Sequence, residues 1–229
     1  MMASIHQPQY MPWIGYIDKI DRSDVFILLD NVQYKKNEWQ NRNRIKTSQG
    51  WQWLTVPVLY RFPEKINEVR INNGVDWRRK HLTAIETNYR RTPYFIKYFP
   101  YFEDIYRKNW ERLVDINITL IKMLTDLFGI KKKIFIASEF ETRDEPDGRL
   151  IDLCGSVGAD TYLSGKDGPK YMGMDAFERA GIEVVIQDFK HPVYQQLYEG
   201  FEPNLSCIDI LFNCGENGME MIRKGRISS

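Results

Sequence analysis

Short apolar runs alternate with amphipathic stretches along most of the chain. Residues 2–6 and 24–30 are apolar runs of strand length, and an amphipathic helix is predicted between them from about Trp13. The second run is continuously apolar and ends in an acid, which is typical of a buried parallel strand. The pattern therefore predicts strand, helix and strand within the first thirty residues.

The same alternation continues to the C-terminal region. Further strands are predicted at 51–58, 66–71, 134–137, 161–163 and 182–187, and helices at 76–91, 102–128, 147–157, 174–180 and 208–212. His81 shares a helical stripe with Trp77, Ile85 and Tyr89, which predicts a packing role for it. The chain is predicted to be one α/β domain over 1–229. Its sheet is Rossmann-like and mainly parallel with flanking helices, and a helical subdomain is expected at about 76–128.

Composition excludes several classes of protein. Hydrophobic residues are 43% and charged residues 28% of the chain, which argues against disorder. There is no run of eighteen apolar residues and no signal-peptide hydrophobic region, so we expect no membrane span and a cytoplasmic location. Three cysteines without a Cys-x-x-Cys pair and three scattered histidines predict neither a disulfide framework nor a metal site. No heptad pattern identifies an oligomer interface.

Charge is distributed unevenly along the chain. Residues 1–100 hold 16 Lys and Arg against 9 Asp and Glu, whereas residues 101–229 hold 16 against 22. A basic half suits an anionic ligand such as a nucleotide or a phosphosugar. An unevenly charged, solvated surface would give the same counts.

A polar segment follows the first predicted strand. His6 and Gln7 lie at its carboxyl end, and Trp13, Gly15 and Tyr16 open the helix. Ligands of open α/β sheets bind at the carboxyl ends of strands, and helix N-termini favour anions. His6 is therefore a candidate catalytic base, and the other four are candidate substrate contacts. The alternative is that the two prolines of this segment merely shape a turn.

Two other strands end in residues that suit a sugar or a phosphate. Asp30 and Gln33 follow the second strand, where Asp30 could accept a ribose or sugar hydroxyl. Ser164, Gly165 and Lys166 follow the strand at 161–163 in a glycine-containing loop, and such loops expose main-chain N–H groups to phosphate. An ordinary polar turn is the alternative, since no Walker A motif is present.

A basic extended stretch lies between these two segments. Arg42, Arg44 and Lys46 alternate, so they are predicted to share a face and to offer donors to phosphate. Asn41 and Asn43 are expected on the opposite face, as candidate contacts to sugar hydroxyls. The alternative is an edge strand protected by its charges.

The last polar segment begins after the strand at 182–187. His191 is the second candidate acid or base at neutral pH, and Tyr194 and Gln195 are candidate substrate contacts. Ser206 is predicted to cap the helix at 208–212, and Asp209 falls in its first turn, where the helix dipole favours an acid. Those two residues therefore have a structural explanation.

Four stretches together resemble the WbqC-like protein family. They are His6-Gln7-Pro8 through Tyr16, Trp39 through Arg44, Tyr162-Leu163-Ser164-Gly165, and His191-Pro192-x-Tyr194-Gln195 through Gly215. The resemblance covers almost the whole chain. It implies a cytosolic protein encoded among genes for O-antigen and other surface polysaccharides, with a suggested role in modifying amino sugars by an amino acid such as glycine.

A fainter resemblance is to class I nucleotidyltransferases and aminoacyl-tRNA synthetases that carry a HIGH motif. The matching tetrapeptide is Trp13-Ile14-Gly15-Tyr16, in which the glycine is kept and both histidines are replaced. Ser164-Gly165-Lys166 would correspond loosely to the lysine- and serine-containing loop late in that fold. This resemblance implies the α/β topology and an adenylation activity.

The leading hypothesis is acyl or aminoacyl transfer to the amine of a nucleotide-linked amino sugar, a lipopolysaccharide-pathway reaction. His6 or His191 would be the base, and Arg42 and Arg44 would hold the diphosphate. ATP or an activated acyl or aminoacyl donor, including an aminoacyl-tRNA, is the expected co-substrate. The alternatives are an ATP-dependent nucleotidyltransferase or ligase, and a nucleotide-sugar binding or scaffolding protein without catalysis.

Overall fold

A computed structural model describes residues 1–226 of the protein and shows a five-stranded parallel sheet at its centre. The strands are β1 (Met2–His6), β2 (Val25–Leu28), β7 (Lys133–Ile136), β8 (Thr161–Ser164) and β9 (Glu183–Ile186). They pair in the order β7–β2–β1–β8–β9, which is 3-2-1-4-5 when these strands are counted along the chain. This is a doubly wound arrangement, and it confirms the Rossmann-like α/β prediction.

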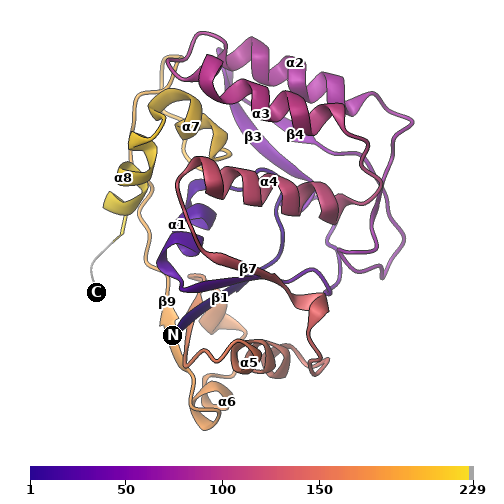
Figure 1. Ribbon diagram of the computed structural model, residues 1–229, viewed down its shortest axis with the longest axis vertical. Helices are drawn as coiled ribbons and strands as arrows, with labels where there is room; N and C mark the ends of the chain where they lie inside the picture. Colours follow the sequence, from indigo (N-terminus) through magenta and orange to yellow (C-terminus); the bar gives the residue numbers. More distant parts are fainter. Residues whose placement is uncertain (227–229) are drawn as a thin grey trace.

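Helices cover both faces of the sheet (Figure 1). On one face lie α1 (Ile14–Arg22) and α4 (Leu113–Leu127), with α7 (Ile208–Cys214) and α8 (Asn217–Lys224) packed beside them. On the other lie α5 (Pro146–Ser156) and α6 (Met174–Arg179). Two short 3₁₀ helices, η1 (Ala137–Glu139) and η2 (Gly168–Lys170), follow β7 and β8. Nowhere in residues 1–226 does a helix combine the length and the apolar character needed to cross a membrane.

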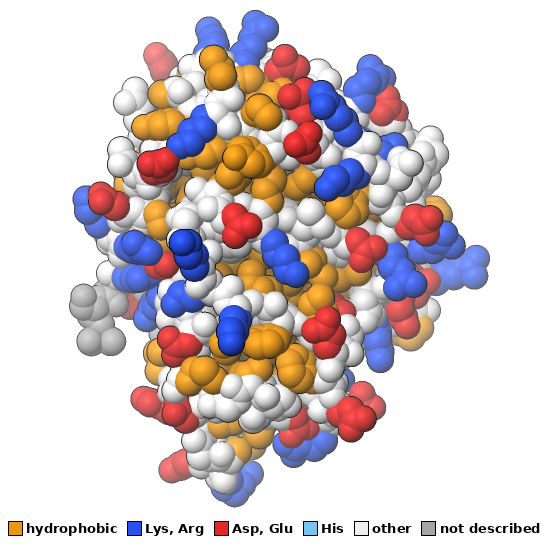
Figure 2. All heavy atoms as spheres, viewed as in Figure 1, with side chains coloured by type: hydrophobic (Ala, Val, Ile, Leu, Met, Phe, Trp, Pro, Cys, Tyr) orange, Lys and Arg blue, Asp and Glu red, His pale blue; other side chains and the backbone are white. Residues whose placement is uncertain are grey.

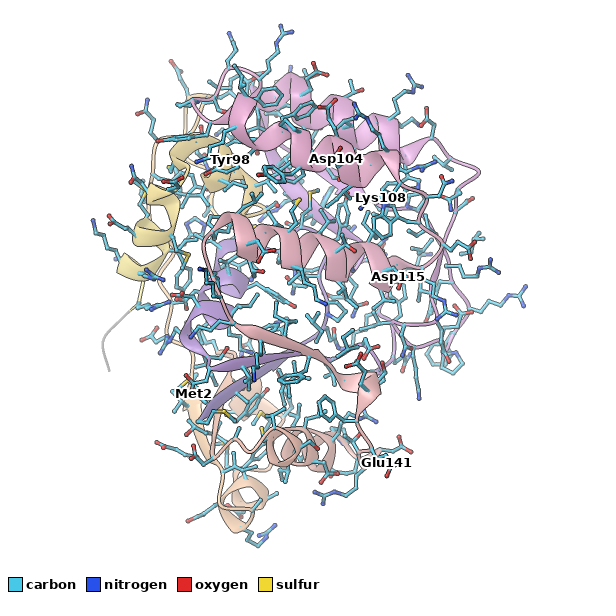
Figure 3. All side chains as sticks on the ribbon, in the orientation of Figure 1. Met2, Tyr98, Asp104, Lys108, Asp115 and Glu141 are labelled. Atoms are coloured by element: carbon cyan, nitrogen blue, oxygen red, sulfur yellow. The ribbon has the colours of Figure 1, made fainter. Side chains whose placement is uncertain are left out.

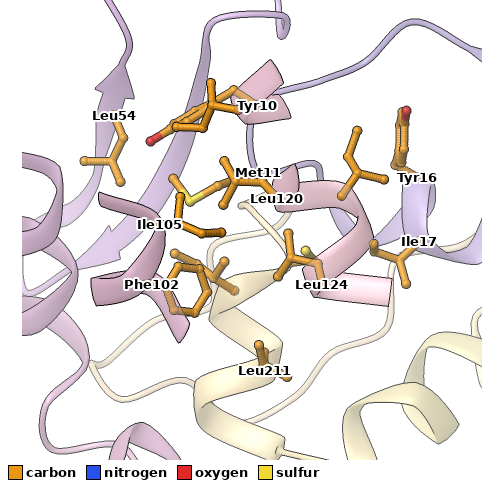
Figure 4. Close-up of a cluster of buried hydrophobic side chains, with 14 of the residues drawn as sticks. Tyr10, Met11, Tyr16, Ile17, Leu54, Phe102, Ile105, Leu120, Leu124 and Leu211 are labelled. Carbon is orange, nitrogen blue, oxygen red and sulfur yellow. The ribbon is translucent and has the colours of Figure 1, made fainter. Parts of the chain in front are cut away.

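A long insertion separates β2 from β7. It contains the antiparallel pair β3 (Arg42–Thr47) and β4 (Gly50–Thr55), the short pair β5 (Val58–Leu59) and β6 (Arg70–Ile71), and the helices α2 (Trp77–Tyr89), α3 (Phe95–Arg107) and α4. The predicted stripe of α2, which includes His81, is buried. Figure 4 shows how the insertion joins the core, since Leu54 of β4 and Phe102 of α3 gather with Met11 and with Leu120 of α4.

The prediction of a single helix over 102–128 is wrong. The structure has two helices, and the residues between Arg107 and Leu113 are not helical. Arg112 forms an isolated bridge with Arg70 of β6, where the Ile71 N–H donates to the Glu111 carbonyl at 2.8 Å and the Leu113 N–H donates to Val69 at 3.0 Å. A tertiary partner therefore overrides the local apolar periodicity of 102–128. The helix α8, near the C-terminal end, is absent from the sequence-based prediction.

The outer surface of these two helices is charged in both signs. Asp104 on α3, Lys108 just beyond its end and Asp115 on α4 are labelled in Figure 3, and all three are exposed. In Figure 2 basic and acidic side chains are interspersed over this face of the molecule. An interspersed surface of this kind is typical of a solvated face.

The C-terminal segment is held by a buried carboxylate. Asp209 accepts hydrogen bonds from Tyr89 Oη at 2.9 Å, Tyr194 Oη at 2.8 Å and Gln196 Nε2 at 2.9 Å, and burial raises its pKa to about 6. Asp209 lies in the first turn of α7, as predicted, and these three hydrogen bonds hold its carboxylate in addition to any effect of the helix dipole. Ser206 is not the capping residue, because the helix starts after Cys207 and the Ser206 hydroxyl only accepts a 3.4 Å hydrogen bond from the Ile208 N–H.

We predict that Tyr194→Phe lowers the free energy of unfolding by about 1.5–3 kcal/mol, the usual value of a hydrogen bond to a charged group. Urea unfolding at pH 7.5 measures this change. Tyr101→Phe is the control, because the Tyr101 side chain is 47% exposed, and its substitution should change stability by less than about 0.5 kcal/mol. Equal effects of the two substitutions would contradict a stabilising role of the Asp209 network.

Candidate functional site

The order of the strands reverses between β1 and β8. From β1 the chain proceeds outward to β2 and β7, and it then returns across the sheet to β8 and β9. His6 ends β1 and Ser164 ends β8, while Gly165 and Lys166 follow in the next loop. Two predicted segments thus lie at neighbouring carboxyl ends, which is where doubly wound sheets bind ligands.

His6 is partly accessible and uncharged at neutral pH. Its Nδ1 lies 3.2 Å from the Gln7 carbonyl, and its ring contacts Tyr16 edge-on with 4.8 Å between centroids. Burial, with the nearby charge of Lys19 as a second cause, lowers the pKa of His6 to about 3. If Nδ1 carries the proton donated to that carbonyl, Nε2 is the acceptor of the ring. A base with so low a pKa accepts a proton only weakly at pH 7.

Lys19 is a buried amine that the sequence analysis missed. It lies on the face of α1 that packs on the sheet, one turn after Tyr16, and it is 3% exposed. Within residues 1–226 its Nζ has one hydrogen bond, a 3.4 Å contact to the Ile5 carbonyl, and no carboxylate partner. Burial lowers the pKa of Lys19 to about 7, so its uncharged form is well populated at neutral pH. No local signal in the sequence marks Lys19, because helical spacing places it off the apolar stripe of Ile14, Ile17 and Ile20.

The loop after β2 closes on the end of β1. Gln40 Nε2 donates to Gln7 Oε1 at 2.7 Å, and Gln40 Oε1 accepts from the Lys35 N–H at 2.9 Å. The Tyr10 N–H donates to the Trp39 carbonyl at 3.0 Å. Gln7 is therefore fixed beside His6 and joined to the region around Trp39.

Arg42 and Arg44 lie on one exposed face of the β3–β4 hairpin together with Trp39, Trp51 and Trp53, and we call these five residues the Arg–Trp face. The Arg42 guanidinium lies 4.3 Å from the Trp53 ring centroid, and that of Arg44 lies 4.9 Å from Trp51 and 5.9 Å from both other rings. Within residues 1–226 neither arginine forms an ion pair, and both Nε atoms are buried without a partner.

The third basic residue of the predicted stretch is placed differently. Lys46 is buried, and its Nζ donates to the carbonyls of Glu199 and Gly200 at 3.2 and 2.6 Å. The expectation of three basic side chains on one open face thus holds for Arg42 and Arg44, whereas Lys46 fastens the C-terminal segment to β3.

Several predicted ligand contacts have protein partners instead. Asp30 accepts from the Ser138 N–H and Oγ at 2.9 and 2.7 Å. Asn41 Nδ2 donates to the Val56 carbonyl at 2.9 Å, and Asn43 Nδ2 donates to Met11 at 2.7 Å. These three side chains are buried and hold main-chain segments in place. Gln33 is exposed, and its main chain forms an isolated bridge with Lys65.

The start of α1 is packed against an indole ring. Trp13 precedes the first turn, and its ring lies so close to Gly15 that a Cβ atom there would be 2.3 Å from the nearest ring carbons. Phe189 contacts the same indole edge-on, with 5.8 Å between centroids. Trp13 and Gly15 thus form a packing contact at the position where the sequence suggested an anion.

His191 belongs to a different part of the molecule. Its Nδ1 lies 2.8 Å from the Pro192 carbonyl, its ring stacks on Tyr194 and contacts Phe201, and burial lowers its pKa. None of these contacts is shared with His6, so the two candidate bases do not form one site through direct contacts. Gln195 is exposed and lines a separate cavity of about 530 Å³ with Arg91 and other residues.

We predict that Gly15→Ala destabilises the protein by about 1–3 kcal/mol, since the added methyl must displace the Trp13 ring from a packed site. The midpoint of thermal unfolding measures the change. Gly165→Ala is the matched control, because no atom lies within 4 Å of a Cβ built there. A midpoint that stays at the wild-type value in Gly15→Ala would contradict the packing.

We predict that the free energy of unfolding rises with pH from about 7 toward 10.5, because the unfolded chain then binds more protons at Lys19 than the folded protein does. One such group contributes about 1.4 kcal/mol per pH unit. Lys19→Met removes this rise, so its stability relative to the wild type is greatest near pH 7 and declines above it. Lys166→Met, at an exposed lysine, should give a curve parallel to the wild type. Parallel curves for Lys19→Met would disprove the depressed pKa.

Comparisons with known proteins give one consistent relationship. Residues 7–221 match the WbqC-like protein family. The chain is also 38% identical over 225 residues to Uncharacterized protein Rv1507c of Mycobacterium tuberculosis (strain ATCC 25618 / H37Rv), an alignment that covers 96% of this chain and 97% of the relative. No solved structure is significantly similar to this chain. Because the family match covers nearly the whole chain, the chain belongs to the WbqC-like protein family.

Proposed function

We propose that the protein transfers an acyl or aminoacyl group, such as glycyl, to the amino group of a nucleotide-linked amino sugar used for a surface polysaccharide. The observation that carries this proposal is the Lys19 amine beside His6 at the carboxyl end of β1. A sugar amine attacks an acyl group only when it has lost its extra proton, so the reaction needs a proton acceptor that works near neutral pH.

In this proposal Lys19 accepts the proton, either directly from the sugar amine or by way of the His6 ring. A general base is most effective when its pKa is close to the working pH, and the lowered pKa of Lys19 meets that condition better than that of either histidine. His6 is partly exposed and follows Ile5, whose carbonyl accepts the hydrogen bond of the Lys19 amine. The sequence had suggested His6 or His191 as the base.

The chemistry balances without a redox partner. The sugar nitrogen forms a bond to the acyl carbon, and a proton leaves that nitrogen for the acceptor. The tetrahedral intermediate then collapses, the bond from the acyl carbon to the donor's leaving group breaks, and the leaving group takes up a proton. Gln7 adjoins the end of β1, and we assign the nucleotide diphosphate to the Gly165 and Lys166 loop, which follows the neighbouring strand β8. Arg42 and Arg44 then remain available to the acyl donor on the Arg–Trp face.

A nucleotidyltransferase-like ligase that uses ATP is the second candidate. The observation in its favour is the 3-2-1-4-5 sheet with α1 beginning close behind β1, the topology that the HIGH-motif resemblance implies. Against it stands the Trp13 indole at the start of α1, where that class holds its phosphates. Release of pyrophosphate from ATP in the presence of an amino acid distinguishes this reaction from direct transfer.

The experiment is a ligand panel followed by product detection. Nucleotide-linked amino sugars, nucleotide-linked neutral sugars, ATP and amino acids are tested by thermal shift, and binding pairs are incubated with activated donors. Mass spectrometry is expected to show one acyl mass added to the amino sugar and none to its neutral analogue. Absence of binding to every nucleotide sugar would overturn the proposal.

We predict that Lys19→Met and His6→Gln each lower turnover by about 10²- to 10⁴-fold while nucleotide-sugar affinity changes less than threefold, because general-base catalysis has that magnitude. His191→Gln separates the two histidines that the sequence suggested, and we expect it to lower turnover less than tenfold, since its contacts are unrelated to those of His6. Full turnover in both Lys19→Met and His6→Gln would show that neither side chain is the base, whereas nucleotide-sugar binding without any turnover in the wild type would support a binding or scaffolding protein.

A further inference from the structure

The Arg–Trp face is unusual because large aromatic side chains are exposed there together. Trp39, Trp51 and Trp53 are 37%, 42% and 38% exposed, and neighbouring ring centroids are 5.5 and 5.6 Å apart. The planes of Trp51 and Trp53 are inclined by 82° and those of Trp39 and Trp53 by 44°. Rings at such angles do not form one flat platform for a sugar polymer, but each can stack on a separate planar group.

The two arginines add fixed positive charge between the rings. Both guanidinium groups are stacked on tryptophan, and each has one terminal nitrogen bound to a main-chain carbonyl, of Asn37 for Arg42 and of Asn204 for Arg44. Stacked arginines keep their outer edges for an anion, and the strand spacing sets these two about 7 Å apart at their Cα atoms. A ligand with repeated phosphates suits this arrangement better than one with a single charge.

The face adjoins a groove between β4 and α2, which is largely apolar where Trp53 lines it and polar farther along α2. Between β4 and α2 lie two hollows of about 360 and 380 Å³, which share Gln52, Lys80 and Ala84. Trp53 lines the second hollow, so the groove begins at the Arg–Trp face. Its remaining polar side chains include Arg79, which is paired with Asp76, and Thr83, Thr87 and Asn88. Of the residues that the structure describes, no carboxylate lines either hollow.

The charge of the surrounding insertion favours a polyanion. Residues 31–91 hold 13 Lys and Arg against 5 Asp and Glu, whereas the whole chain has a net charge of only +1. Aromatic rings that stack unpaired bases, beside a basic groove that follows a phosphate backbone, are the common elements of single-strand recognition. The hydroxyl and amide side chains of the groove offer partners to the 2′-hydroxyl, which RNA has and DNA lacks.

We propose that the Arg–Trp face and the adjoining groove bind an unpaired RNA strand, with bases stacked on Trp51 and Trp53 and phosphates on Arg42, Arg44 and Lys80. This part of the inference rests on the proposed transfer reaction: the acyl group would then be carried on the single-stranded end of an RNA that binds this surface. The Tyr10 N–H donates to the Trp39 carbonyl and Gln40 donates to Gln7, so the Arg–Trp face adjoins the segment that follows β1.

The test is a fluorescence titration of the full chain with a ten-nucleotide oligoadenylate at low and moderate salt. Stacking on the exposed indoles is expected to quench tryptophan emission. Trp51→Ala and Trp53→Ala should each weaken binding by roughly 5- to 150-fold, which corresponds to the stacking of one base. Arg44→Ala should reduce the slope of log affinity against log salt by about 0.7, the value for one phosphate contact on a single strand.

Matched variants keep the test independent of folding. Trp51→Phe retains a stacking ring and should restore most of the affinity lost in Trp51→Ala, while Tyr101→Ala and Arg107→Ala remove exposed side chains of the same kinds from α3 and should bind as the wild type does. Equal affinity for the deoxyadenylate strand, equal competition by dextran sulfate, or wild-type binding in Trp51→Ala and Trp53→Ala would each overturn the RNA assignment. RNA binding without any amino-sugar product would refute the transfer reaction and leave this surface intact.

Discussion

The burial of an irregular loop is the constraint on which the rest of the structure depends. Residues 8–12 connect β1 to α1, have no regular secondary structure and are all buried. Buried main-chain groups must find hydrogen-bond partners, and a loop cannot supply them from itself. Asn117 of α4 donates to the Pro8 carbonyl, Asn43 of β3 donates to Met11, and the Cys207 N–H donates to Pro12. The loop thus fixes the positions of α4, β3 and the C-terminal helices relative to the sheet.

This constraint explains why several polar residues that suggested a ligand have structural partners. An asparagine can serve in ligand binding or in the structure, because an amide that can bind a sugar hydroxyl can equally donate to a buried main-chain carbonyl. Asn41 and Asn43 do the latter. Asp30 similarly ties the end of β2 to the turn after β7 through Ser138. Among the described residues, the Nε atoms of Arg42 and Arg44 on the Arg–Trp face are buried without a partner, and other such atoms lie elsewhere, for example Tyr34 Oη and Tyr98 Oη.

Lys19 lowers the stability of the fold but is suited to accept a proton. Burying an ammonium group without a carboxylate is unfavourable, and the protein lowers that cost by keeping the amine largely uncharged near neutral pH. An uncharged amine at the carboxyl end of the central strand is also a proton acceptor. Groups whose pKa is shifted by burial in this way concentrate at functional sites. The neighbouring carboxylates of α1 do not neutralise Lys19, because Asp18 and Asp21 are paired with Arg226 and Arg223.

The sequence by itself determined the α/β class, most strand and helix positions, and the place of the segment around His6 at the carboxyl end of the first strand. Apolar runs and helical periodicity are local properties, and parallel strands bring their carboxyl ends to one edge whatever lies between them. Tertiary structure alone decided that 102–128 is two helices, that Asp209 is buried among tyrosines and that Lys19 rather than a histidine has a pKa near 7. Each of these depends on a partner distant in the sequence or on exclusion from water. Local sequence patterns predict neither distant partners nor the degree of burial.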